Sequence, residues 1–229
     1  VAVTESAGST EVIEGGATDS YSIVLTSQPT SDVTINIAYD PSQVSLNGDA
    51  DGSYSRVFTS ANWNLAQTVT VAAVDDTVVE SNPHATSIVQ PVGSSDPVYA
   101  VINPADVAVS IAENDSQQIV FALAASSVAE TAGTHVVNAR LNLTTNGAPG
   151  GTIAADMSAN VFLVVGSAEL SDLGLGTAQL TFAAGSAHDA VQPITLNLAN
   201  DRLLEGNETG TLSLGLVGSL GSVSGTHAL

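Results

Sequence analysis

The residues best suited to chemistry in this sequence are carboxylates, and the stretch "NGDADGSYSRVF" spaces them most suggestively. Asn47, Asp49 and Asp51 alternate and a Gly follows, which is how an EF-hand calcium loop begins. The twelfth position of that loop must be a Glu that binds the ion with both oxygens. Here it is Phe58, and the flanking residues form short extended runs where helices are required. The EF-hand is therefore excluded, and the many acidic residues need another explanation.

Charge and composition exclude several classes of partner and chemistry. The 229 residues include 23 Asp plus Glu, three Arg and no Lys, for a net charge of -20. A chain without clustered cations cannot neutralise the phosphates of nucleic acid or of an anionic membrane surface. No apolar run reaches the 18 residues typical of a membrane-spanning helix, so direct membrane insertion is not expected. Cys is absent, which excludes disulfides, thiolate metal sites and a Cys nucleophile.

The elements that would position the carboxylates are short strands. Apolar residues occupy every second position in "YSIVLTS", "VTINIAY", "TVTVAAV" and "VAVSIA", and again in "VVNARLNL", "AQLTF" and "ITLNL". Val, Ile and Thr are frequent in these runs, and turn-forming residues separate them. This pattern is typical of an all-β sandwich.

An internal repeat indicates two copies of this sandwich. "VIEGGATDSYSIVLT" aligns with "VAETAGTHVVNARLN", which places Glu14 opposite Glu130. "VTVAAVDDTVVESNP" aligns with "ITLNLANDRLLEGNE", which places Glu80 opposite Glu205. We therefore predict two tandem immunoglobulin-like sandwiches, at residues 1–115 and 116–229.

The second sandwich is predicted to lack its last strand. The interval that follows Glu80 in the first copy contains the strand "VAVSIA" and ends at Asp115. The same interval counted from Glu205 extends past Leu229. Either the strand lies outside this fragment or a neighbouring subunit donates one to the open edge.

The acidic residues of the first copy are expected to meet at one tip of the sandwich. Asp75 and Asp76 end one strand, Glu14 ends the opening strand, and Glu113 ends the last strand. Two carboxylates about 4 Å apart repel by roughly 4 kcal/mol at an effective dielectric constant near 20. A hard cation with six to eight oxygen ligands, Ca²⁺ before Mg²⁺, suits such a cluster. The alternative is that the acids simply occupy solvated loops.

The sequence also resembles a known family. "FTSANWNLAQTVTVAAVDDTVVE" with "SSDPVYAVINPADVAVSIAENDS" resembles bacterial surface repeats related to Calx-β domains, and "FAAGSAHDAVQPITLNLANDRLLEGNETGTLSL" is similar to the Calx-β core. The resemblance implies seven-stranded immunoglobulin-like sandwiches, many of which bind calcium at one tip. Pro83, Asn114 and Asn200 stand where the family often has an acidic residue. The ligands it implies are Glu14, Asp75, Asp76, Glu80, Glu113 and Asp115, with Asp49 or Asp51, in the first copy, and Glu130, Asp201, Glu205 and Glu208 in the second.

These observations predict a calcium-stabilised structural or adhesive repeat of a larger extracellular or cell-surface protein, bacterial in origin. Its expected partners are neighbouring repeats or subunits of the same assembly, with a cell-surface or glycan target. It is not expected to be an enzyme, because the four His lack metal-ligand spacing and no Ser–His–Asp order occurs. Two alternatives stay open: a fibre subunit completed by strand donation, and a carbohydrate-binding accessory module, which would need an exposed aromatic platform.

Overall fold

The computed structural model describes residues 1–167, 172–200 and 208–229, and these residues fold almost entirely into strands. They form twenty-two β-strands and one 3-10 turn, η1 (Glu130–Ala132). The predicted all-β fold is confirmed. The chain divides into two compact units: residues 1–76 with 82–114, and residues 77–81 with 115–229. That residues 1–115 and 116–229 are two Calx-β-like sandwiches stays a prediction.

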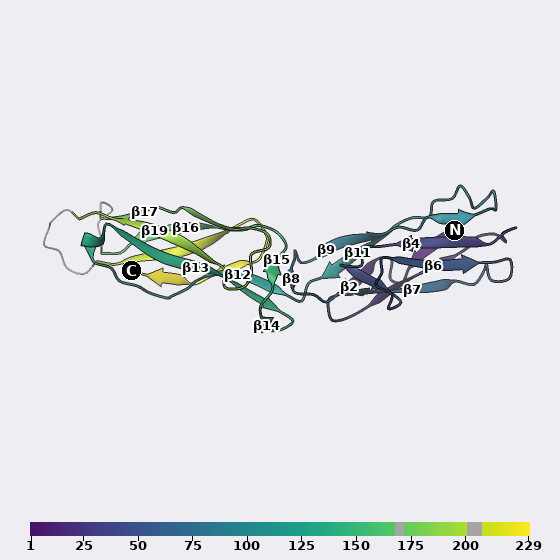
Figure 1. The fold of residues 1–229 in the computed structure, drawn as a ribbon, viewed down its shortest axis with the longest axis horizontal. Helices are drawn as coiled ribbons and strands as arrows, with labels where there is room; N and C mark the ends of the chain where they lie inside the picture. The colour runs from purple at the N-terminus through teal and green to yellow at the C-terminus, as the bar shows by residue number, and fades with distance from the viewer. Residues whose placement is uncertain (168–171, 201–207) are drawn as a thin grey trace. The chain divides into compact units, whose positions relative to one another are not determined.

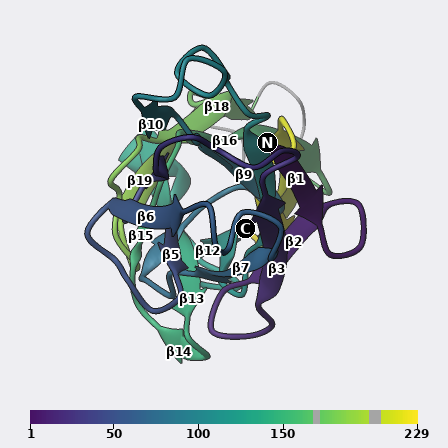
Figure 2. The same ribbon diagram turned by 90° about the vertical axis from the view of Figure 1, so that its right-hand side faces the viewer.

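One layer of the first unit is a four-stranded antiparallel sheet (Figures 1 and 2). Its order is β1 (Ala2–Glu5), β3 (Asp19–Val24), β7 (Gln67–Ala73) and β5 (Val44–Leu46). Alternate residues of these strands, such as Tyr21 and Ile23 of β3, are buried, because successive side chains of a strand point to opposite faces.

The other layer of the first unit contains the strands that lead to Glu14 and Glu113. β4 (Val33–Ala38) lies between β10 (Val92–Ser94) and β6 (Ser53–Phe58). β11 (Val107–Ala112) lies between β2 (Thr10–Ile13) and β9 (His84–Ile88). β11 is antiparallel to β9 but parallel to β2, so β2 and β11 end at the same edge of their sheet. The strands of both layers share one core with Tyr21, Ile35, Phe58 and Ile111 at its centre.

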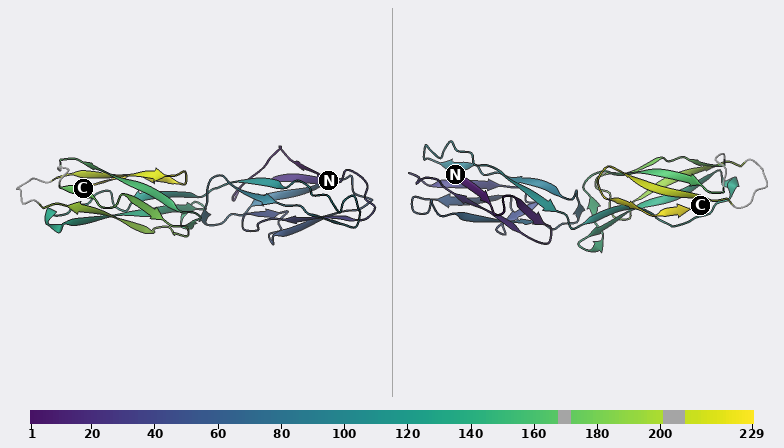
Figure 3. Two further views of the ribbon diagram at one scale, coloured as in Figure 1. Left: turned by 90° about the horizontal axis from the view of Figure 1, so that it is seen from above. Right: turned by 180° about the vertical axis from the view of Figure 1, so that it is seen from behind.

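The second unit has the same two-layer plan (Figures 1 and 3). Its first sheet follows the order β17 (Leu173–Leu175), β19 (Val191–Leu198), β13 (Thr134–Thr145), β12 (Ser116–Phe121) and β21 (Ser222–Ser224), and β14 (Ala148–Pro149) pairs with β13. The second sheet follows the order β18 (Gln179–Phe182), β16 (Met157–Val165), β20 (Gly210–Val217) and β22 (Thr226–Ala228). β15 (Thr152–Ile153) pairs in parallel with β8 (Val78–Val79). Ile119, Leu141, Phe182 and Leu196 are buried between the sheets.

A short last strand stands where the sequence predicted none. β22 pairs antiparallel with β20, with His227 opposite Leu212, just as β11 pairs antiparallel with β9 in the first unit. It has three residues where β11 has six. The offset between the two repeats did not reveal β22, because the chain after β20 does not repeat the spacing of the first unit. β21 joins one sheet, and Gly225, with φ +86°, then leads into β22 on the other sheet.

Candidate metal centre

Glu14 and Glu113 are brought together by the parallel pairing of β2 and β11. Ile13 and Ala112 are the last paired residues of these strands, so Glu14 and Glu113 follow at the same edge. The backbone N–H of Glu14 donates to the carbonyl of Ala112 at 3.1 Å, which continues the ladder by one step. The exposed fractions of Glu14 and Glu113 are only 4% and 8%. Two acidic residues about a hundred positions apart in the sequence are thus buried beside each other.

The side chain of Asn82 fixes the backbone of Glu113 from the opposite side. Its amide nitrogen donates to the carbonyl of Glu113 at 3.2 Å, and its amide oxygen accepts from the N–H of Glu113 at 3.2 Å. This pair of bonds extends the pairing of β9 and β11 beyond the ends of the strands. The direction in which Glu113 leaves β11 is therefore set by hydrogen bonds on both sides.

The carboxylates of Glu14 and Glu113 approach each other closely. One oxygen of Glu14 and one oxygen of Glu113 lie within 4.8 Å of each other. At that distance and an effective dielectric constant near 20, two ionised carboxylates repel by about 3.5 kcal/mol. Such a pair of carboxylates can take part in binding a hard cation. Asp115 belongs to the second unit, where it is 9% exposed and one of its oxygens accepts the N–H of Asn146 at 2.8 Å.

Asp75 lies beside this group and is held by Asn114. The amide nitrogen of Asn114 donates to the carbonyl of Glu14 and to a carboxylate oxygen of Asp75, both at 3.1 Å. A Cβ on Gly15 would lie 3.0 Å from the other Asp75 oxygen and 3.1 Å from the Asn114 amide nitrogen. Gly15 also has φ +58°, so both its backbone conformation and its surroundings favour glycine. Asn114 stands where Calx-β domains often have an acidic residue, and its side chain links the predicted ligands Glu14 and Asp75.

His84 was not among the predicted ligands, yet the structure includes it in a group. A carboxylate oxygen of Glu14 and a ring nitrogen of His84 lie within 4.8 Å of each other, whereas Glu80 belongs to the second unit. His84 begins β9, where it is paired with Ile111, two residues before Glu113. His84 was not predicted as a ligand because the four His lack the His–His spacing of metal sites; its position four residues after Glu80 was the signal available in the sequence.

Asp49, Asp51 and Asp76 belong to neither group. Asp76 is half-buried and directly follows Asp75. Asp49 and Asp51 lie in the turn between β5 and β6, where an Asp49 oxygen accepts from the N–H of Asp51 at 3.1 Å. That hydrogen bond is the largest of several causes that hold the pKa of Asp49 below its usual value. The backbone N–H of the neighbouring Asn47 donates to the carbonyl of Thr70 on β7, the strand that precedes Asp75.

In the second unit, no acidic group comparable to that of the first unit is found among the described residues. Glu130 is half-buried in η1, and Glu208 lies just before β20. Asp201 and Glu205 lie outside the described residues. The predicted ligands of the second copy therefore stay a prediction.

The cations of the described chain have other partners. Arg56 donates to the carbonyl of Thr68 at 2.9 Å and lies over the ring of Tyr54. Arg140 pairs with Asp189. With no Lys in the sequence, protein cations are scarce counterions for the first unit's carboxylates.

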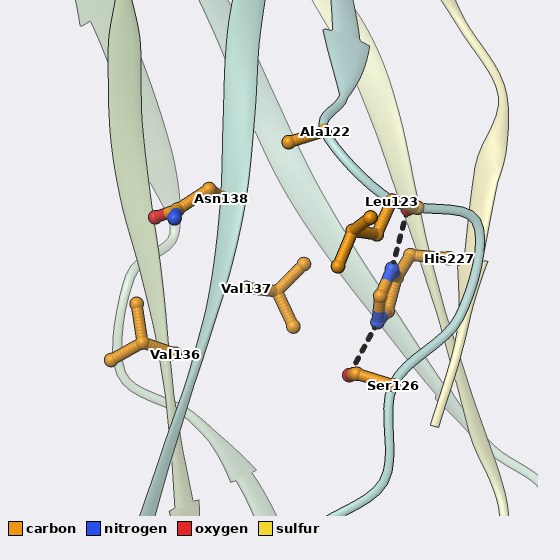
Figure 4. Close-up of a pocket in the computed structure, with 7 residues that line it drawn as sticks. All are labelled: Ala122, Leu123, Ser126, Val136, Val137, Asn138 and His227. Atoms are coloured by element: carbon orange, nitrogen blue, oxygen red, sulfur yellow. Dashed lines mark hydrogen bonds between the residues drawn. The ribbon is translucent and has the colours of Figure 1, made fainter.

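The second unit also contains a small cavity of about 80 Å³, whose polar lining residues are Ser126, Asn138 and His227. Figure 4 shows Ser126 and His227 joined beside Leu123. Nδ1 of His227 donates to the carbonyl of Leu123 at 2.7 Å, so the neutral ring accepts the Ser126 hydroxyl at Nε2. The Ser126 oxygen can then accept from Nε2 of His135 at 2.6 Å. The described residues that line this cavity include no acidic side chain.

Comparisons with known proteins give no family for this chain. No known protein family and no curated protein matches the chain. Among solved structures, CBD12 from CALX1.2 has 11% identity over 94% of this chain and 79% of its own, with a TM-score of 0.35. The apo form of the Calx CBD1 domain has 18% identity over 49% and 95%, with a TM-score of 0.40. The YadV chaperone has 7% identity over the whole of both chains, with a TM-score of 0.32.

No helix in the described part of the chain is long and apolar enough to cross a membrane.

Proposed function

We propose that this chain is a calcium-stabilised structural segment of a larger extracellular or cell-surface protein, and that it is not an enzyme. The observation that supports the proposal is the convergence of Glu14 and Glu113 within the first unit. These two side chains are at most 8% exposed, and an oxygen of one lies within 4.8 Å of an oxygen of the other. Buried carboxylates this close need a cation or protons to offset their repulsion.

The residues present fit calcium. Ca²⁺ takes six to eight oxygen ligands, with carboxylates prominent among them, whereas Zn²⁺ in structural sites favours sulfur and nitrogen. Glu14 and Glu113 would hold the ion, and the ion would supply positive charge beside the two carboxylates. Calcium-binding extracellular modules have dissociation constants of about 10⁻⁴ to 10⁻³ M. A site of that affinity would be occupied where calcium is abundant, which is the basis for the proposed location.

The chain's own part in this role is mechanical. Glu14 follows β2 and Glu113 follows β11, so binding both carboxylates to one ion would join the ends of two parallel strands. An ion that binds only the folded protein, at 100 times its dissociation constant, stabilises that protein by about 2.7 kcal/mol. This is a substantial part of the stability of an ordinary domain.

Calorimetry of the whole chain in EDTA, in millimolar calcium and in millimolar magnesium tests the proposal. We expect calcium to raise one unfolding transition by several degrees and magnesium to raise it much less. Glu14→Gln should abolish the calcium effect. Glu11→Gln, which removes the same charge from an exposed position of β2, should preserve it. If calcium moves no transition of the wild-type protein, the buried carboxylates do not bind calcium and the proposal is wrong.

A further inference from the structure

The outer face of the sheet β18–β16–β20–β22 has no ionisable side chain, although the protein has a net charge of -20. On β16, the residues that point away from the core are Ser158, Asn160, Phe162 and Val164. The residues opposite and beside them on the other three strands are Gln, Thr, Ser, Gly, Val and Ala. We call the outward-facing residues of these four strands the neutral face.

Phe162 forms an aromatic platform on the neutral face. Its side chain is 52% exposed. Among the large hydrophobic side chains that are exposed in the described part of the chain, it is the one aromatic residue. A Cβ on Gly215 of β20 would lie 2.7 Å from Cε2 of Phe162, so the ring packs directly against the backbone of Gly215. The glycine leaves room for the ring to lie there. Phe162 is therefore an exposed ring whose position is set by its neighbour.

Neutral hydrogen-bonding groups lie next to this ring. The side-chain nitrogen of Gln179 is 3.4 Å from the side-chain oxygen of Asn160, and the hydroxyls of Ser158 and Thr181 are 2.8 Å apart. Each amide keeps further donors or acceptors after these contacts, because an amide side chain has two N–H groups and two acceptor positions. The face thus combines one aromatic surface with several uncharged donors and acceptors.

We propose that the neutral face binds a neutral polysaccharide, with a sugar ring stacked on Phe162 and its hydroxyls bound by Asn160, Gln179 and their neighbours. A sugar presents both apolar C–H groups and neutral hydroxyls, which this combination of side chains matches. The net charge of -20 opposes an anionic polymer, and a second copy of the chain would add another -20. A cationic partner would find no carboxylate on this face. The inference does not depend on calcium binding.

Affinity electrophoresis in native gels tests the proposal with the whole chain. The gels contain dextran, hydroxyethyl cellulose or galactomannan, with polygalacturonate as the anionic control. We expect at least one neutral polysaccharide to retard the protein, and polygalacturonate not to. Phe162→Ala should weaken binding by roughly tenfold or more, which corresponds to about 1.4 kcal/mol. Val191→Ala, at an equally exposed position on the other sheet, should bind like the wild type.

Gly215→Ala serves as a second variant, because the added methyl group must displace the Phe162 ring without removing it. It should also weaken retardation. Retardation by none of the neutral polysaccharides, or equal retardation of Phe162→Ala and wild type, would overturn the proposal. A dimer in sedimentation that Phe162→Ala dissociates would also overturn it, in favour of self-association. Parallel gels with EDTA and with calcium keep this outcome separate from that of the calcium proposal.

Discussion

Replacing Glu113 by Gln should change the stability of the protein in opposite directions with and without calcium. In EDTA the substitution removes the repulsion between Glu113 and Glu14. This repulsion is about 3.5 kcal/mol at 4.8 Å if both groups are ionised. Proton uptake by either carboxylate reduces this gain, and burying the new amide costs about 1–3 kcal/mol. We expect a net gain of about 1 kcal/mol, or roughly 4–8 °C in Tm for a unit of this size.

In millimolar calcium the same variant should unfold at a lower temperature than the wild type, because it has lost one ligand. Calorimetry of both proteins in the two buffers measures whether the difference in unfolding temperature changes sign between EDTA and calcium. Glu11→Gln, which removes an exposed charge, should change stability by less than about 0.5 kcal/mol in either buffer. If Glu113→Gln destabilises the protein as much in EDTA as in calcium, then protein partners stabilise Glu113 by more than Glu14 repels it, and the reasoning from repulsion is wrong.

Two further predictions concern backbone conformation and pH. Gly15→Ala should lower the free energy of unfolding, measured in urea, by about 1–2 kcal/mol, because the new methyl group crowds Asp75 and the backbone has a positive φ. Gly8 also has a positive φ, +88°, but open space around it, so Gly8→Ala should lower the free energy of unfolding by the conformational cost alone. Burial, and then His227, lower the pKa of His135, so the stability from its neutral form is complete above pH 6.5 and declines as the pH falls below that value. His135→Gln should reduce the decline in urea midpoint between about pH 7.5 and 5, and an unchanged decline would exclude His135 as its source.

Much of the fold could be predicted from local patterns. The alternation in "VTINIAY" predicted β4, and that in "ITLNL" predicted part of β19, because a strand with one buried face repeats every two residues. β22 could not be predicted in this way. It has three residues and no alternation long enough to detect, and it exists because Gly225 lets the chain pass from one sheet to the other.

The sequence by itself determined which chemistry is available: an excess of carboxylates, no Lys and no Cys, and acidic residues at the ends of strands. Only the tertiary structure decided which of those residues meet. Glu14 and Glu113 are adjacent because β2 and β11 run in parallel, and strand direction and pairing depend on contacts across the whole sandwich. The same holds for the neutral face, where the antiparallel register of β16 and β20 brings the Phe162 ring onto Gly215. Residue type is local information, whereas proximity between distant segments is a property of the folded chain.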